Sequence, residues 1–443
     1  METINLFLIF ITIFFSGALA WKRLRQNNVS CVFYAVYLAI FGLAQILGLV
    51  LGADSSFPIA IRLKANIVNI GVLFSLFLGE NLIFQKPWLV KTFPVKKSNA
   101  QKDNFYLSVL LWVTFIISFG GFLLLIRRGG ASDLGRWLFS LILISNYISL
   151  VKRKWIMFGI GTLLVLDILT IASARAFLIY IIGPLLYYYI TVKTKKNFSA
   201  RKAIMVGLCI PLFFIVFETV HLWRWQPQRT AGMFSKYLFD KKTYLFLLNN
   251  PKSEFNYRLY YFRIIDLFPR QYGWLYGNTY KTVFLFWLSS RKSEGIKVDT
   301  MYKVADALTE TSSAYLERRS VQPTFTGDCY INFGYLFWLP ALIWGMGLAF
   351  LHIKAQRNIF WNVLAGSSLV YFLALSLRGS ISMAFFQIIL CAAFLMIMFV
   401  ILGVPYELPR DPKPLINCAE SKSLTTLKQV AGKYLFYRRK GNE

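Results

Sequence analysis

MAFFQIILCAAFLMIMFVILG, residues 383–403, contains no charged side chain and decides the class of fold. About 20 helical residues cross the hydrocarbon core of a bilayer, and this run has that length. Similar apolar runs recur along the chain, in which 57% of all residues are apolar. Because an unpaired backbone group is costly in lipid, each run is expected to form a helix. The sequence therefore predicts an all-α polytopic membrane protein.

The apolar runs predict about eleven transmembrane helices. They cover residues 4–20, 31–52, 65–84, 105–126, 137–151, 155–171, 177–192, 203–220, 330–351, 360–376 and 383–403. The chain then divides into helices one to eight (1–220), a long hydrophilic loop (221–329), helices nine to eleven (330–403) and a basic tail (404–443). Within the long loop, residues 256–267 and 301–316 are expected to form short helices.

Short basic connections predict the orientation of the chain. Lys and Arg are enriched in short cytoplasmic loops. The basic segments fall in alternate connections, at residues 22–25, 86–102, 152–154 and 193–202. This pattern places the N-terminus outside the cytoplasm and the C-terminal tail inside it. The long loop is then expected on the outer side.

The formal net charge of +29 follows mostly from this topology. Cytoplasmic Lys and Arg face anionic lipid headgroups, at about 1 kcal/mol each, so the charge does not indicate a nucleic-acid partner. Residues 421–439 combine apolar and basic positions, which is typical of a helix that lies on the inner leaflet. A solvated tail is the alternative. Membrane lipids are the expected partners of the basic surfaces.

Residues that commonly build cofactor sites are sparse. The five cysteines are scattered, without the spacing of a disulfide framework or a zinc site. The two histidines, His221 and His352, fall on opposite predicted faces of the membrane. The sequence has no Gly-rich phosphate loop or dinucleotide motif between a strand and a helix. We therefore expect no metal ion and no other cofactor.

Arginines at the outer face are the first indication of chemistry, because charge at this depth is costly and usually functional. Arg175 and Arg378 each lie in a short connection between two apolar helices. A snorkelling anchor is one explanation. The other is a phosphate or pyrophosphate site, which suits the planar guanidinium group. Between residues 222 and 327 the loop adds sixteen Lys and Arg against eight Asp and Glu, which favours an anionic substrate.

The long loop is also rich in aromatic side chains. Aromatic rings stack on planar and ring-shaped partners, but they also build small cores and lie at bilayer interfaces. Composition alone leaves these roles open. The candidates for sugar contact are Tyr276, Tyr280, Tyr330 and Trp274.

Asp328 lies at the exit of the loop, in the sequence TFTGDCYINFG (residues 324–334). A carboxylate at the start of a helix is stabilised by the helix dipole, so capping is the simplest role for Asp328. The same position suits a general base that takes a proton from a hydroxyl, beside arginines that hold a leaving phosphate. Glu317, Asp306 and His221 are the alternative bases.

Residues 327–347 resemble the closing motif of the Wzy-type O-antigen and oligosaccharide repeat-unit polymerases, in which an acidic residue precedes Tyr-x-Asn-Phe-Gly and an apolar helix. Residues 172–178 look like the family's small-residue, arginine and apolar turn. YGNTY at 276–280 looks like its Gly-[Ser/Thr/Asn]-x-Tyr element, and Arg378-Gly379 is similar to its arginine-glycine pair. The family's Ile-Pro-Arg and Lys-Pro are replaced here by LSSRK, which leaves Arg291 as the match without either proline.

The resemblance implies a GT-C-like architecture and a glycosyltransferase at the periplasmic face of a bacterial inner membrane. Such polymerases move a growing glycan from its undecaprenyl pyrophosphate carrier onto the non-reducing-end sugar of another lipid-linked repeat unit. Asp328 would deprotonate the attacking hydroxyl. The implied pyrophosphate ligands are Arg175, Arg378, Arg291, Arg224, Arg229 and Arg263. A co-polymerase that regulates chain length is a further implied partner.

Two other functions remain open from the sequence. An O-antigen ligase, which transfers finished glycan to lipid A core, would share the helices, the long loop and the arginines, and His221 at the loop entry is compatible with it. A transporter or flippase for lipid-linked sugars would need charges along a path through the bilayer. Acidic residues are rare in the apolar runs, which disfavours the transporter.

Overall fold

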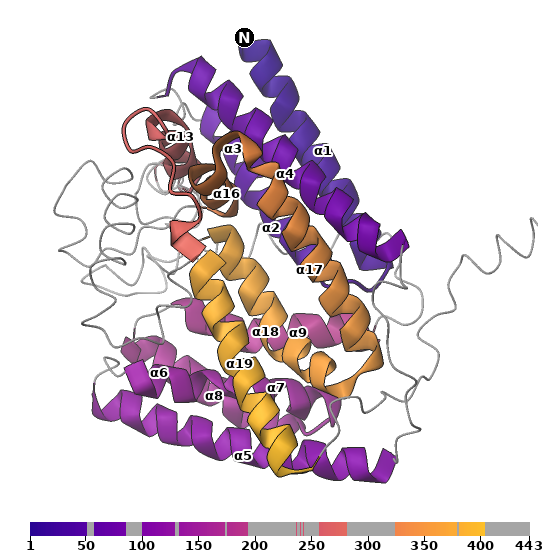
Figure 1. Ribbon diagram of the computed structural model, residues 1–443. Helices are drawn as coiled ribbons and strands as arrows, with labels where there is room; N and C mark the ends of the chain where they lie inside the picture. The colour runs from indigo at the N-terminus through magenta and orange to yellow at the C-terminus, as the bar shows by residue number, and fades with distance from the viewer. Residues whose placement is uncertain are drawn as a thin grey trace, which may run out of the picture.

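Ten of the eleven predicted apolar runs coincide with helices in the computed structural model (Figure 1). The structure describes residues 1–50, 57–85, 100–128, 133–172, 175–193, 257–280, 324–378 and 381–403, with single positions at 236, 240 and 242. These residues are mainly helical, and they include no β-strand. The predicted helices 203–220 and 301–316 and the basic tail lie outside the described residues.

The described helices fall into two groups along the chain. The N-terminal group comprises α1 (Glu2–Arg25), α2 (Ser30–Tyr37), the π-helical turn η1 (Leu38–Leu43), α3 (Ala44–Val50), α4 (Ile59–Gln85), α5 (Ala100–Arg127), α6 (Asp133–Ser140), α7 (Ile142–Val151), α8 (Trp155–Ala172), η4 (Arg175–Leu178), α9 (Ile179–Tyr188) and η5 (Tyr189–Lys193). The C-terminal group comprises α13 (Tyr257–Leu267), α16 (Phe325–Phe333), η7 (Gly334–Leu336), α17 (Trp338–Arg357), α18 (Ile359–Arg378) and α19 (Ile381–Ile401). The helix expected at 256–267 is present as α13.

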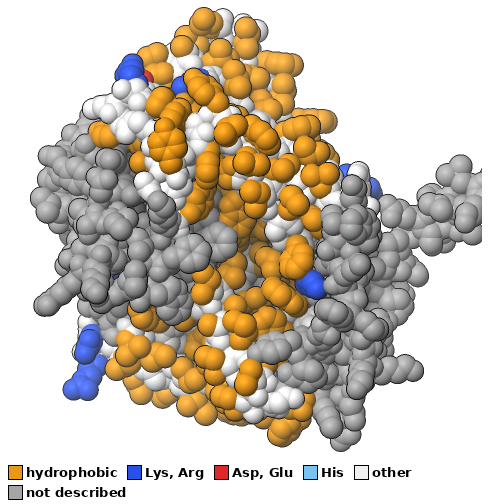
Figure 2. Space-filling model, viewed as in Figure 1, with side chains coloured by type: hydrophobic (Ala, Val, Ile, Leu, Met, Phe, Trp, Pro, Cys, Tyr) orange, Lys and Arg blue, Asp and Glu red, His pale blue; other side chains and the backbone are white. Residues whose placement is uncertain are grey.

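Among the described residues, six helical segments are long and apolar enough to cross a membrane. They are Glu2–Arg25, Ser30–Val50, Ile59–Gln85, Phe105–Arg127, Leu134–Val151 and Trp338–Gln356. Shorter apolar helices are present at Trp155–Ile168, Ile179–Thr191, Ile359–Leu373 and Gln387–Ile401. Figure 2 shows hydrophobic side chains over the described part of one face, with Lys and Arg towards its edges. The protein therefore has the character of a polytopic α-helical membrane protein.

Helices α4 and α17 cross with their backbones in contact. A Cβ atom at Gly79 would overlap the carbonyl oxygen of Leu342, and one at Gly345 would overlap the carbonyl oxygen of Leu76. Glycine allows this approach, and close packing is what holds helices together in lipid, because lipid tails are as apolar as the helix surfaces. The crossing therefore fixes α17 against the N-terminal helices.

Both ends of α1 are tied to α4 by ion pairs. At the start of α1, Arg62 Nη2 lies 2.6 Å from Glu2 Oε1, whose side chain is 65% exposed. At the other end, Arg23 Nε lies 2.7 Å from Glu80 Oε2, and both side chains are buried. The Tyr34 hydroxyl donates to the same Glu80 oxygen at 2.9 Å. A buried ion pair is tolerated only while each charge keeps its partner, so removing one partner of the inner pair is expected to destabilise the fold more than removing one partner of the exposed pair.

Glu80→Gln is expected to lower the free energy of unfolding by about 2 kcal/mol, because it leaves the buried Arg23 guanidinium without a compensating charge while preserving the shape of the side chain. Glu2→Gln removes the exposed carboxylate of the other pair and is expected to change stability by less than about 1 kcal/mol. The midpoint of thermal unfolding in detergent measures both effects. Equal midpoints for the two variants would contradict the prediction.

The predicted helix 330–351 is corrected by the structure. Gly334 has a φ of +55°, a left-handed conformation that glycine adopts without a steric penalty. A Cβ atom at Gly334 would also lie 2.8 Å from the Trp274 ring. The chain therefore breaks here into the short helix α16 and the long helix α17. Asp328 lies in the first turn of α16 and not at the start of a membrane-spanning helix.

α13 and α16 lie at the end of the helix bundle where α1 begins (Figure 1). The Tyr261 hydroxyl of α13 donates to the carbonyl oxygen of Ala65, near the start of α4, at 2.9 Å. On α16, Thr326 Oγ1 lies 3.3 Å from the Tyr37 hydroxyl. The Arg23 ion pair lies at the opposite end of α1. The N-terminus and these two loop elements thus share one end of the bundle; the side of the membrane on which they lie stays a prediction.

Candidate functional site

Asp328 is buried in a small polar cluster between α16 and the turn at residues 273–280. Its Oδ1 accepts hydrogen bonds from Thr279 Oγ1 at 2.9 Å and from Asn332 Nδ2 at 3.1 Å. Asn332 Nδ2 also donates to Thr279 Oγ1 at 2.6 Å. Asp328 and Asn332 are fully buried, and Thr279 is nearly so. We call Asp328, Thr279 and Asn332 the carboxylate cluster.

The helical repeat of α16 explains why Asp328 and Asn332 lie next to each other. Asp328 and Asn332 are four residues apart and therefore share one face of the helix. Thr324 is the N-cap residue, since its side chain accepts a hydrogen bond from the Gly327 N–H at 3.1 Å. The capping role expected for Asp328 thus belongs to Thr324, because α16 begins one turn earlier than the apolar pattern indicated. The Asp328 carboxylate is left to contact side chains.

Thr279 reaches the cluster from a turn at residues 273–280 that is docked on α16. The Leu275 N–H donates to the carbonyl oxygen of Ile331 at 2.9 Å. Gly277 has a φ of +79°, which suits glycine, and Tyr276 adopts a φ of +46°, which is uncommon for a residue with a side chain. The turn therefore holds segment 276–280 against segment 327–334.

Tyr280 and Cys329 are ionisable neighbours of Asp328. Burial raises the pKa of the Tyr280 phenol well above its usual range, and the negative charge of Asp328 raises that pKa further. The same two causes, in the same order, raise the pKa of the Cys329 thiol. Both groups are therefore neutral at physiological pH. Asp328 is left as the member of this neighbourhood that can carry the charge.

The four aromatic residues predicted to contact sugar differ in exposure. Tyr276 is 77% exposed, and Trp274 and Tyr280 are partly exposed. Tyr330 is 1% exposed, and its hydroxyl donates to the carbonyl oxygen of Phe268 at 3.2 Å. Tyr330 therefore packs as a core residue in this structure, and its assignment as a sugar contact stays a prediction. Aromatic composition could not separate these positions, because core and surface use the same residue types.

Arg175 and Arg378 lie at the same end of two adjacent helices. Arg175 begins η4, just before α9, and Arg378 is the last residue of α18. Near these ends the rings of Tyr180 and Tyr371 pack with centroids 5.3 Å apart. The indole of Trp344 contacts aromatic rings of both α16 and α18, so this end of α18 is the one nearer to α16. The backbone thus brings both arginine positions to the end of the bundle that holds Asp328.

Of the remaining predicted site residues, the structure describes Arg263 alone. Arg263 lies partly buried on α13. The others lie outside the described residues: Arg291, Arg224, Arg229, Glu317, Asp306 and His221. The structure adds Arg258, which is fully buried on α13. Nothing in the sequence distinguishes Arg258 from the other cations of the loop.

Metal binding finds no support in the described residues. Within them, no group of three or more His, Cys, Asp or Glu side chains is arranged to hold a metal ion. The expectation that the protein needs no metal stays a prediction, because much of the long loop lies outside those ranges.

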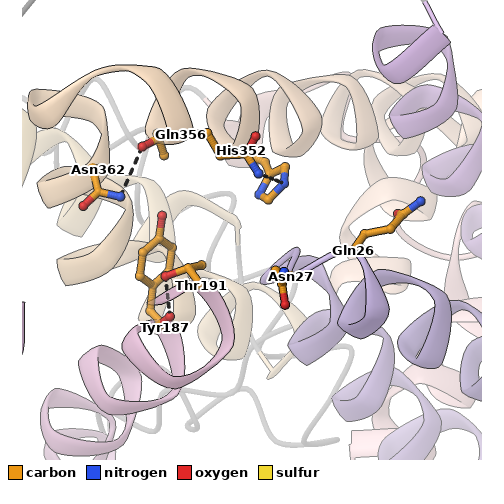
Figure 3. A pocket seen from close by; sticks show the side chains of 8 residues that line it. Gln26, Asn27, Tyr187, Thr191, His352, Gln356 and Asn362 are labelled. Atoms are coloured by element: carbon orange, nitrogen blue, oxygen red, sulfur yellow. Dashed lines mark hydrogen bonds between the residues drawn. The ribbon is translucent and has the colours of Figure 1, made fainter. Parts of the chain in front are cut away.

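A second polar cluster lies at the opposite end of the bundle, between α1, α9 and the connection from α17 to α18 (Figure 3). His352 Nε2 lies 2.8 Å from Gln356 Nε2 there. The polar side chains around the cavity are Gln26, Asn27, Tyr187, Thr191, His352, Gln356 and Asn362. The cavity volume of about 30 Å³ suits a few water molecules. It is too small for a sugar, so we do not propose it as the substrate site.

No family model, curated protein or solved structure matches this chain. The assignment of the candidate site therefore rests on the identity and geometry of its residues and not on a related protein. Thr279 and Asn332 were not among the predicted site residues, although both lie in the segments that resemble polymerase motifs. The signal that could have revealed them is the presence of a hydrogen-bonding side chain in each of the two motifs.

Proposed function

We propose that this protein polymerises undecaprenyl-pyrophosphate-linked oligosaccharide repeat units into O-antigen or a related surface polysaccharide, at the periplasmic face of a bacterial inner membrane. One observation carries the proposal. Segments 276–280 and 327–334, which resemble two motifs of one polymerase family, meet around the buried Asp328 carboxylate. Six long apolar helices in the described part of the chain support membrane insertion. We include the four shorter apolar helices and residues 203–220 as further spans, which gives about eleven.

The proposed reaction is a glycosyl transfer with Asp328 as the general base. Asp328 accepts the proton of the acceptor hydroxyl while that oxygen bonds to the anomeric carbon of the donor glycan. The bond between the anomeric carbon and the pyrophosphate oxygen breaks, and the lipid pyrophosphate leaves with the electron pair. Arginines at positions 175, 378 and 291 would stabilise the leaving charge, so we propose no required divalent cation.

Burial of Asp328 sets a condition on this reaction. The carboxylate is fully buried, so an acceptor hydroxyl reaches it only after a neighbouring side chain moves. Tyr280 is the partly exposed ionisable neighbour in the described residues. We propose that movement of the Tyr280 side chain opens the cluster to the acceptor.

A strain that lacks this gene is expected to carry single repeat units on its lipopolysaccharide, because export and ligation continue without polymerisation. Returning the wild-type gene on a plasmid is expected to restore the full ladder. Gel electrophoresis of purified lipopolysaccharide measures both. Bare lipid A core in the deletion strain would instead indicate a ligase, and lipid-linked units trapped in the cytoplasmic leaflet would indicate a flippase.

A further inference from the structure

We propose that Thr279 and Asn332 are positioning residues for the Asp328 base: they fix its Oδ1 and hold the carboxylate in its charged, proton-accepting form. The inference rests on the proposed function, in which Asp328 takes the proton of the acceptor hydroxyl. It concerns two residues that neither the charge pattern nor the arginine positions single out.

The orientation of the Asn332 amide is fixed by the backbone. Its Nδ2 donates to the carbonyl oxygen of Asp328 at 2.8 Å, and its Oδ1 lies 3.5 Å from the Thr279 N–H. The reversed amide would place two acceptors together at the Asp328 carbonyl and two donors together at Thr279. Asn332 therefore presents N–H, and not oxygen, to the carboxylate.

The direction of the next hydrogen bond follows from this orientation. Thr279 Oγ1 accepts from Asn332 Nδ2 at 2.6 Å. A hydroxyl has one hydrogen, which is then available for Asp328 Oδ1 at 2.9 Å. The two hydrogens of Asn332 Nδ2 serve its two shorter contacts, to the Asp328 carbonyl oxygen and to Thr279 Oγ1. Thr279 thus donates to Asp328 Oδ1, and Asn332 orients that hydroxyl while its Nδ2 lies 3.1 Å from the same carboxylate oxygen. Hydrogen bonds to the charged form favour that form, whereas burial alone would favour the neutral acid.

Other ionisable groups near the described part of α16 do not replace these donors. Tyr280 and Cys329 are neutral, as shown above, and burial likewise raises the pKa of Tyr261 on α13. Further groups on elements packed against this end of α16 include the cations Lys64, Arg258 and Arg263, the phenol Tyr37 and the carboxylate Asp266, which pairs with Arg270 at 3.2 Å. All of these are unchanged when Thr279 or Asn332 is substituted.

Thr279→Val and Asn332→Leu test the proposal in the full-length protein. Each variant is expected to move the acid limb of the pH profile of kcat/KM upwards by about one pH unit. Thr279→Val removes the hydroxyl that donates to the charged carboxylate, and Asn332→Leu removes the amide that orients this hydroxyl. Polymer formation from purified lipid-linked repeat units gives this profile. The fall in rate is expected in kcat rather than in KM, and Thr279→Ser is expected to restore the wild-type profile. Thr326→Val is the matched control, because it removes a buried α16 hydroxyl that faces Tyr37 instead of Asp328.

A second measurement does not depend on activity. Infrared titration of protein with ¹³C-labelled aspartate, taken as the difference from Asp328→Asn, follows the protonation of Asp328 directly. An unshifted titration and an unshifted profile in both Thr279→Val and Asn332→Leu would overturn the proposal, and so would an equal shift in Thr326→Val. If the wild-type protein forms no polymer from lipid-linked units, the proposed function fails, while the infrared titration still decides whether Thr279 and Asn332 keep Asp328 charged.

Discussion

Asp328→Asn is expected to lower the rate of polymer formation by about 10² to 10⁴-fold, the usual contribution of a positioned general base. Asparagine preserves the size of the side chain, and its Oδ1 can still accept hydrogen bonds from Thr279 and Asn332. It cannot take a proton from an acceptor hydroxyl. Polymer ladders in the complemented deletion strain, and rates with purified lipid-linked units, measure the loss.

Asp266→Asn is the matched control for this variant. It removes a carboxylate on α13, at the same end of the bundle, whose partly exposed ion pair with Arg270 contributes little. We expect normal ladders from it, with both variants present in the membrane at the wild-type level. A normal ladder from Asp328→Asn would end its assignment as the base and would direct attention to Glu317, Asp306 or His221.

The fold was predictable where apolar length alone decides it. The run at 105–126 is found within α5, because nothing in lipid competes with helical hydrogen bonding over such a stretch. The single helix predicted at 330–351 was wrong because the apolar pattern continues across Gly334. The break there depends on backbone conformation and on the Trp274 ring packed against Gly334, and hydropathy carries no information about either.

The sequence allowed Asp328 to be predicted as a site residue, but it did not allow the side chains that surround Asp328 to be predicted. A carboxylate at a loop exit draws attention to Asp328, yet its partner Thr279 is 49 residues earlier in the chain. That contact exists because the turn at 273–280 docks on α16 through the backbone hydrogen bond from Leu275 to Ile331, a tertiary contact that has no local periodicity in the sequence. The prediction that Asp328 caps a helix was wrong for a local reason, because Thr324, four residues earlier, is the N-cap of α16.

Gly345→Leu is expected to prevent correct packing of the bundle, lowering the free energy of unfolding by more than about 4 kcal/mol. The new Cβ atom would overlap the Leu76 carbonyl oxygen and lie 3.0 Å from the backbone nitrogen of Glu80. These are backbone atoms of α4, so no side-chain rotation relieves the overlap. The helices must separate, which also disturbs the buried Arg23 ion pair of Glu80.

Gly347→Ala separates this effect from the helix propensity of glycine. Gly347 lies on the same helix, and a Cβ atom there would meet no heavy atom within 4 Å. Alanine is favoured over glycine in helices by up to about 1 kcal/mol, so this variant is expected to be as stable as the wild-type protein or slightly more so. Size-exclusion profiles and thermal midpoints in detergent compare the two. A monodisperse Gly345→Leu protein with the midpoint of Gly347→Ala would show that α4 and α17 do not rely on backbone contact, because only a wider crossing can accommodate leucine.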